Sequence, residues 1–215
     1  MKGSKVTFDA ILSQTRRYYE KKLGAYGPTP KGVDWNSAAS QELRFEQLLK
    51  VCDTSNTFTL NDYGCGYGAL VAYMTGRDYR FEYNGFDLSA QMIDAARKEY
   101  GDFGHCRFSS DEGGLGVVDY TVASGIFNVK LHTSDEEWKG YGLYILGKIE
   151  KLSKKGFAFN ALTKYSDPEV MRDGLFYADS LFLFDYCKRS FSRFVAALYG
   201  YPLYEFTMLV RKEEN

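Results

Sequence analysis

Residues 60–70 read LNDYGCGYGAL. The residues up to Tyr63 are typical of the end of a buried strand, and Ala69 opens a run that is typical of a helix. Between them lie three glycines separated by single residues. Glycine lets the backbone approach a ligand closely and adopt positive φ angles, and the amides at the helix start point towards that ligand. The stretch therefore predicts a ligand-binding turn, with Asp62 beside it at the carboxyl end of the strand.

After this turn, strands and helices alternate along the chain. We expect strands at residues 57–63, 83–87, 105–109, 118–124 and 156–162, with helices at 69–75, 89–100, 134–152 and 179–188. This alternation predicts a sheet of parallel strands with helices on both faces. Two further β-rich runs, at 193–199 and 203–212, are joined by so short a turn that they must pair antiparallel. The predicted fold class is α/β, with a mostly parallel seven-stranded sheet that ends in an antiparallel hairpin.

The residues before the turn form a separate region. Apolar residues at helical spacing predict a first helix over 8–23, and a loop rich in Gly and Pro follows it. A second helix is expected to run through Val51, with Asn36 or Ser37 as its N-cap. We therefore expect an N-terminal helical extension or lid over residues 1–52 and the main domain over residues 53–215.

The composition excludes several classes of function. Lys and Arg number 27 against 28 Asp and Glu, and no dense basic run appears, so we expect no nucleic-acid partner. The four cysteines are widely spaced and give neither a zinc pattern nor a disulfide framework, so we expect no metal. No apolar run has the length of a signal-peptide core or of a membrane span. We expect a cytoplasmic protein that binds no membrane and is a monomer or a homodimer.

Two carboxylates follow the next two expected strands. Asp87 ends the strand at 83–87, 21 residues after Gly66 (87 − 66), where a carboxylate can accept hydrogen bonds from both hydroxyls of a ribose. Asp111 follows the strand at 105–109, where a side chain can meet the amino group of an adenine. Both positions are consistent with a bound adenine nucleoside.

The order of these features resembles that of the class I S-adenosylmethionine-dependent methyltransferases, which have a Rossmann-like fold. The shared pattern is Asp-x-Gly-x-Gly-x-Gly, an acidic strand end, an Asp after the third strand and a closing hairpin, and it covers residues 57–212. The resemblance implies that S-adenosylmethionine is the cofactor and that a small molecule accepts the methyl group on an O or N nucleophile. The cofactor-binding residues that it implies are Asp62, Gly64, Cys65, Gly66 and Gly68 at the turn, Asp87 for the ribose, Leu88 and Met92 beside the adenine, Asp111 for its amino group, Ser124 and Trp35.

The segment after the fourth strand faces the transferred methyl group in enzymes of this fold. Asn128 lies in that segment and can orient a hydroxyl or an amine, and His132 can accept its proton near neutral pH. The alternatives are a turn role for Asn128 and a surface position for His132. The residues expected to bind the acceptor are aromatic or amide side chains, namely Tyr18, Tyr19, Tyr26, Phe127, Asn160 and Tyr165.

Trp35 stands between Asp34 and Asn36 in the loop before the second helix. In related small-molecule methyltransferases an N-terminal extension folds over the cofactor, which implies that Trp35 closes the site and excludes water. The alternative is a helix cap at Asn36 with Trp35 as a hydrophobic staple. Arg44 on the following helix either pairs with a carboxylate of the cofactor or acceptor or forms a surface salt bridge.

Two other functions compete with methyl transfer. The stretch Gly64–Ala69 also fits the dinucleotide pattern G-x-G-x-x-A, so an NAD(P)-dependent oxidoreductase is an alternative. Against it, Asp62 would repel a pyrophosphate, and the closing hairpin does not suit a six-stranded parallel sheet. A non-catalytic subunit that binds the cofactor is the second alternative, although the complete glycine pattern favours an enzyme.

Overall fold

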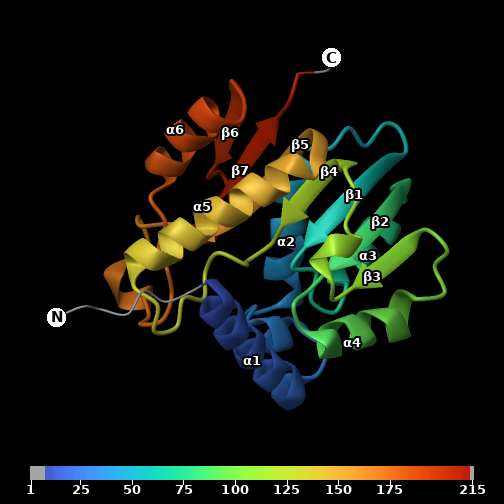
Figure 1. The fold of residues 1–215 in the computed structure, drawn as a ribbon, viewed down its shortest axis with the longest axis horizontal. Coiled ribbons are helices and arrows are strands. Elements are labelled where there is room, and N and C mark those ends of the chain that lie inside the picture. Colours follow the sequence, from blue (N-terminus) through green and yellow to red (C-terminus); the bar gives the residue numbers. More distant parts are fainter. Residues whose placement is uncertain (1–7, 214–215) are drawn as a thin grey trace.

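A central sheet organises residues 8–213, which are the part of the chain that this computed structural model describes (Figure 1). In those residues the sheet has seven strands: β1 (Phe58–Tyr63), β2 (Phe81–Phe86), β3 (Cys106–Ser109), β4 (Val118–Ala123), β5 (Ser153–Leu162), β6 (Phe194–Leu198) and β7 (Glu205–Arg211). Their order is β3-β2-β1-β4-β5-β7-β6. Strands β1 to β5 pair parallel, whereas β7 pairs antiparallel with both β5 and β6. The predicted fold class, including the closing hairpin, is confirmed.

Two helical layers cover the sheet. One apolar cluster joins the sheet to α2 (Ala38–Leu49), α3 (Ala69–Thr75) and α4 (Ala90–Tyr100). A second cluster joins it to α5 (Asp135–Lys151) and α6 (Ser180–Ser190). Strands β1 and β4 are buried along nearly their whole length, as expected for parallel strands covered on both faces. The loops at the carboxyl ends of these strands are therefore where the fold places a ligand site.

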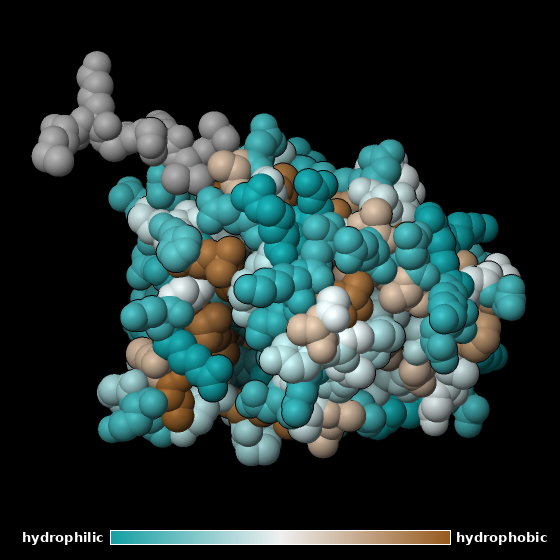
Figure 2. Space-filling view, turned by 90° about the horizontal axis from the view of Figure 1, so that it is seen from below, coloured by the Kyte–Doolittle hydropathy of each residue, from teal (hydrophilic) through white to brown (hydrophobic). Residues whose placement is uncertain are grey.

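Helix α1 (Phe8–Tyr26) lies at the bottom of Figure 1, below the ends of the central strands. It is anchored by Ile11, which is 1% exposed and belongs to the same cluster as α5. Seen from the side of α1, the surface is mainly hydrophilic, with separate hydrophobic spots rather than one apolar face (Figure 2). The helix thus turns a polar side outwards while its inner side covers the strand ends.

The start of α2 is fixed by a capping box. The Ser37 hydroxyl accepts a hydrogen bond from the Ser40 amide at 3.1 Å, and the Ser40 hydroxyl accepts one from the Ser37 amide at 3.3 Å. Of the two predicted N-caps, Ser37 is therefore the observed one. Phe45 and Leu48 place α2 in the apolar core against the sheet, so α2 is packed together with the main domain. None of the helices in the described residues is both long and apolar enough to span a membrane.

Candidate active site

The glycine-rich turn joins β1 to α3 in a conformation that side chains disfavour. Gly64, Gly66 and Gly68 have φ angles of 88°, 54° and 83°, all in the left-handed region. A β-carbon on Gly64 would lie 2.3 Å from Cγ2 of Ile126, so the turn packs directly against the segment that follows β4. The alternating glycines of the sequence are thus explained by backbone geometry and close packing.

Asp87, which follows β2, holds this turn in place. Its Oδ2 accepts a hydrogen bond from the Gly66 amide at 2.9 Å, and its Oδ1 accepts one from the Ser89 amide at 2.9 Å. Burial raises the pKa of Asp87, whereas the two amide hydrogen bonds act in the opposite direction. Each oxygen retains a lone pair, so the carboxylate can still accept hydrogen bonds from ligand hydroxyls.

Asp62 near the end of β1 is a buried carboxylate, 3% exposed. Its Oδ2 accepts a hydrogen bond from the Tyr83 phenol at 2.8 Å, and no cationic side chain of residues 8–213 pairs with it. Burial raises the pKa of Asp62 to about 7; the Tyr83 hydrogen bond lowers it and the charge of Asp87 raises it. A positively charged group of a ligand would stabilise the ionised form of this carboxylate.

A cavity, here called the turn cavity, opens beside Asp62 and Asp87. Its walls come from α1, the loop before α2, the glycine-rich turn, the start of α4 and the segment after β4. The lining residues that the sequence predicted for the site are Tyr19, Trp35, Asp62, Gly64, Cys65, Gly66, Asp87, Leu88, Met92 and Ser124. Lining residues that the sequence did not single out include Thr15, Arg16, Val33, Gln41, Phe45 and Trp138.

Ser124 gives the turn cavity an unsatisfied polar atom. Its Oγ is buried and has no hydrogen-bond partner within the described residues. Buried polar atoms are nearly always paired, so this hydroxyl fits a contact with a bound ligand. The turn cavity therefore holds two carboxylates, Asp62 and Asp87, and one unpaired hydroxyl, Ser124.

Two predicted cofactor residues lie outside the lining of the turn cavity. Gly68 is the N-cap of α3, so its part in the site is to shape the turn. Asp111 is exposed, and its Oδ1 accepts a hydrogen bond from the Gly113 amide at 2.9 Å at the start of a short 3-10 helix. Its position does not support the expected contact with adenine, because the side chain turns back on its own loop.

Comparison with known proteins gives a clear relative. No protein-family model matches the chain. A curated protein of Mycobacterium tuberculosis, "Putative methyltransferase Rv1506c", is 44% identical over 164 residues, which are 76% of this chain and 99% of that protein. The chain belongs to the methyltransferase family.

Solved structures agree with this assignment at the level of the fold. The magnesium protoporphyrin IX methyltransferase of Synechocystis PCC 6803, solved with S-adenosylmethionine, has a TM-score of 0.65 at 13% identity, covering 99% of this chain and all (100%) of that one. The 1,6-didemethyltoxoflavin-N1-methyltransferase of Burkholderia thailandensis, solved with S-adenosylhomocysteine, has a TM-score of 0.67 at 16% identity, covering 100% and 94%. The curated relative thus gives the family of the chain, and these neighbours share its fold.

A second, larger cavity of this methyltransferase adjoins the first. We call it the tyrosine cavity, because its wall includes Tyr18, Tyr19, Tyr26, Tyr177 and Tyr204. The three tyrosines of α1 that the sequence predicted for the acceptor all line it. The residues that line both cavities are Tyr19, Val33, Trp35 and Gly125.

Trp35 forms part of this shared wall. Its ring lies 3.9 Å from the guanidinium carbon of Arg44, and a β-carbon on Gly125 would fall 2.4 Å from Cζ2 of the ring. The expected closing position of Trp35 agrees with this geometry. The alternative of a hydrophobic staple beside an Asn36 cap does not, because Ser37 is the cap and the ring packs elsewhere.

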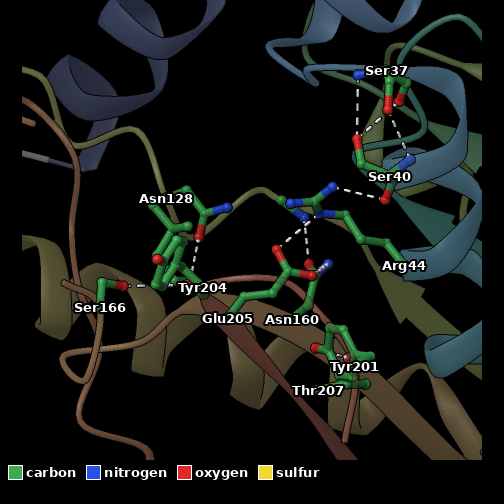
Figure 3. A network of polar contacts seen from close by, with 12 residues as sticks. Ser37, Ser40, Arg44, Asn128, Asn160, Ser166, Tyr201, Tyr204, Glu205 and Thr207 are labelled. Atoms are coloured by element: carbon green, nitrogen blue, oxygen red, sulfur yellow. Dashed lines mark hydrogen bonds and ion pairs between the residues drawn. The ribbon is translucent and has the colours of Figure 1, made fainter. Parts of the chain in front are cut away.

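Arg44 neither reaches the surface nor lines the turn cavity; it forms a buried ion pair (Figure 3). Its Nε donates to Oε2 of Glu205 at 2.8 Å, and its Nη1 donates to the Ser40 carbonyl at 2.8 Å. Burial raises the pKa of Glu205, while the charge of Arg44 lowers it. Sequence reasoning missed Glu205, for which the only signal was a carboxylate at the head of an apolar strand.

Asn160 on β5 continues this network towards the shared wall (Figure 3). The side chain is fully buried, at 0% exposed; its Nδ2 donates to Glu205 Oε1 at 3.3 Å and its Oδ1 accepts from the Gly125 amide at 2.7 Å. These two contacts satisfy the buried amide, whereas the sequence predicted that Asn160 binds the acceptor. It lines neither cavity, so its place is to hold Gly125 rather than to touch a ligand.

Asn128 lines the tyrosine cavity and is 5% exposed. Its Oδ1 accepts a hydrogen bond from the Leu162 amide at 3.0 Å, which ties the segment after β4 to the end of β5. The side chain therefore supports the loop, in agreement with the turn role; it also lines the cavity, where its role towards an acceptor stays a prediction.

Besides Asn160, Gly68 and Asp111, three more predicted residues are not brought to these cavities. His132 is exposed, and Tyr165 is 58% exposed; neither lines the turn cavity or the tyrosine cavity. Phe127 is buried and lines a separate apolar cavity between α5 and α6, next to Trp138. Their expected roles in catalysis and acceptor binding are not supported by their positions.

Asp34 is a charged residue of the tyrosine cavity that the sequence did not assign. It accepts a hydrogen bond from the Tyr18 phenol and pairs with Lys22 at 2.5 Å. Burial and the Asp34 contact together raise the pKa of Tyr18 to about 12. The pair ties α1 to the loop that carries Trp35. In the sequence, the sign of a role for Asp34 was its position next to Trp35.

Proposed function

We propose that the enzyme transfers the methyl group of S-adenosylmethionine to an O or N nucleophile of a small molecule held in the tyrosine cavity. The observation that carries the proposal is the shared wall of the two cavities, formed by Tyr19, Val33, Trp35 and Gly125. A methyl group carried in the turn cavity needs an acceptor within reach, and this wall is where the two cavities meet.

Within the turn cavity, each part of the cofactor has a partner of suitable chemistry. Asp87 accepts hydrogen bonds from the ribose hydroxyls, and Leu88 and Met92 flank the adenine at the start of α4. Asp62 pairs with the ammonium group, and Ser124 Oγ donates its unused hydrogen bond to the carboxylate or accepts one from the ammonium. The glycines leave room for the methionine part along the turn.

The protein contributes alignment and exclusion of water. The bound sulfonium supplies an activated methyl group, so the barrier depends chiefly on an in-line approach of the nucleophile. Trp35 and Tyr19 close the wall between α1 and the segment after β4, and the Asp34–Lys22 pair fixes α1 to this loop. Neither histidine of the sequence lines either cavity, so we assign no histidine as general base.

Calorimetry with S-adenosylhomocysteine, followed by a screen of metabolite fractions with methyl-labelled cofactor, tests this proposal. We expect one binding site per chain and label transfer to a small molecule. Heat and a thermal shift with a nicotinamide dinucleotide but not with S-adenosylhomocysteine would contradict the cofactor assignment. Label that appears only on macromolecules would contradict the small-molecule acceptor.

A further inference from the structure

Arg44 keeps one nitrogen without a hydrogen-bond partner in the wall of the tyrosine cavity. Its Nε and Nη1 are used by Glu205 and by the Ser40 carbonyl. Its Nη2 has no hydrogen-bond partner among the residues that the structure describes, although the residue is only 7% exposed and lines the cavity. A guanidinium nitrogen can only donate, so an unpartnered one in the lining of a cavity is suited to a ligand oxygen.

Asn128 presents a second free donor to the same cavity. Because its Oδ1 accepts from the Leu162 amide, the other side-chain atom is the nitrogen, which can only donate. This Nδ2 has no hydrogen-bond partner within residues 8–213. In Figure 3 the side-chain nitrogen of Asn128 points towards Arg44, away from the oxygen that accepts from Leu162. Arg44 and Asn128 thus each offer an unused donor in the lining of the same cavity.

The network behind Arg44 holds this arrangement rigidly. Glu205 accepts from Arg44 and also from Asn160, and Asn160 in turn accepts from the Gly125 amide. The Trp35 ring stacks on the other side of the guanidinium at 3.9 Å. Glu205 and Asn160 are therefore positioning residues: they fix the direction of Arg44 but do not touch the cavity.

The remaining charges of the tyrosine cavity favour an anion. Lys22 is paired with Asp34, and Arg44 with Glu205. Lys31 and Arg172 also line the cavity and form no ion pair within the described part of the chain; Asp173 is the unpaired carboxylate there. The two cations outnumber that carboxylate, which favours a negatively charged ligand at the mouth.

We propose that an anionic oxygen group of the methyl acceptor, a carboxylate or a phosphate, binds between Arg44 Nη2 and Asn128 Nδ2. This inference rests on the proposed function, because it names the acceptor class of the same cavity. It assigns Arg44 and Asn128 to substrate recognition, and it explains why a buried arginine next to a buried glutamate keeps one nitrogen free.

The test uses three small probes of similar shape: benzoate, phenyl phosphate and the neutral benzyl alcohol. Their binding to the full chain is titrated by ligand-observed NMR, with and without S-adenosylhomocysteine. We expect at least one of the two anions to bind about tenfold more tightly than the alcohol. The anion that binds more tightly shows whether the charged group of the methyl acceptor is a carboxylate or a phosphate.

Asn128→Asp is the decisive variant, because its carboxylate keeps the acceptor for Leu162 and replaces the free donor by a negative oxygen. We expect anion binding to weaken at least about tenfold. The melting temperature and the affinity for S-adenosylhomocysteine should stay unchanged. Asn36→Asp adds the same charge elsewhere in the cavity wall, and is expected to weaken binding less than about threefold.

The outcomes separate this inference from the proposed function. Equal binding of alcohol and anions, no binding of either anion, or equal losses in the two Asp variants would overturn the subsite. If Asn128→Asp loses anion binding and Asn36→Asp does not, the subsite holds. If the unchanged protein at the same time fails to bind S-adenosylhomocysteine, only the cofactor assignment is overturned.

Discussion

The indole of Trp35 lies against the α-carbon of Gly125, so closely that a β-carbon there would fall 2.4 Å from Cζ2 of the ring. Gly125 also has a φ of 76°, which side chains disfavour. The loop before α2 and the segment after β4 therefore meet at a position that only glycine fits. This contact closes the wall between the two cavities.

Gly125→Ala should open this wall. The methyl group strains the backbone by roughly 1–2 kcal/mol and forces the ring of Trp35 to move. Acrylamide quenching measures the result, because the other tryptophan, Trp138, is only 2% exposed and contributes little. We expect stronger quenching and weaker binding of S-adenosylhomocysteine. Gly116→Ala, at the opposite end of β4 with open space around it, is the control and should change neither.

Asp87 and Asp111 give a matched pair of carboxylate variants. Asp87→Ala should weaken S-adenosylhomocysteine binding by about 1–3 kcal/mol, because the ribose hydroxyls lose their acceptor and the Gly66 amide loses its anchor. It should also lower the melting temperature, since two buried amides are left unpaired. Asp111→Ala should change affinity by less than about twofold, because the side chain faces solvent. Equal effects in both variants would show that the ribose lies elsewhere.

The raised pKa of Asp62 predicts a pH dependence with a definite sign. Its pKa in the folded protein is about 7, above the ordinary value of 3.8, so the protonated form stabilises the fold. The stabilisation is complete below pH 3.8, where Asp62 is protonated in both the folded and the unfolded protein. It is lost as the pH rises from 3.8 through 7. Asp62→Asn should therefore raise the melting temperature at pH 8 and have little effect near pH 4.

The same carboxylate should release a proton when the cofactor binds. An ammonium group favours the ionised form, so binding at pH 6 should release about 0.9 proton per site if the free pKa is 7. Calorimetry in two buffers with different ionisation enthalpies measures this number. Affinity should rise between pH 5 and pH 7, and both effects should disappear in Asp62→Asn. Binding without proton release would mean that Asp62 does not contact the ammonium group.

The buried Arg44–Glu205 pair and the exposed Arg189–Asp185 pair have the same Nε–O distance of 2.8 Å. Glu205→Ala should lower the free energy of unfolding by about 3–5 kcal/mol, because it leaves a buried guanidinium without its counter-charge. Asp185→Ala should cost less than about 1 kcal/mol, since solvent screens that pair. Urea unfolding compares the two, and similar losses would contradict the structural role of the buried network.

The fold was predictable because its signals are local and periodic. Strand and helix patterns repeat along residues 57–212, and the short turn before β7 dictates the antiparallel hairpin. The turn residues Asp62 to Gly68 were also predictable, because their spacing encodes a backbone shape that the φ angles now show. The sequence therefore located the edge of the sheet where the site lies.

The polar contacts of the site were not predictable in the same way. Arg44 and Glu205 are 161 positions apart, and Asn160 meets Gly125 across 35 positions, so no local pattern connects them. Asp111 satisfied the spacing expected of an adenine contact, yet its own loop offers the Gly113 amide first. Side chains that pair with distant residues, or that turn back on their own backbone, are visible only in three dimensions.

A crystal structure of the protein grown with S-adenosylhomocysteine shows whether the cofactor binds in the turn cavity with its sulfur at the shared wall. We expect the ribose hydroxyls on Asp87, the adenine between Leu88 and Met92, and the amino group beside Asp62. The sulfur should lie at the wall formed by Trp35 and Gly125, facing the tyrosine cavity. A ligand bound away from the glycine-rich turn, or a sulfur that faces away from the tyrosine cavity, would contradict it.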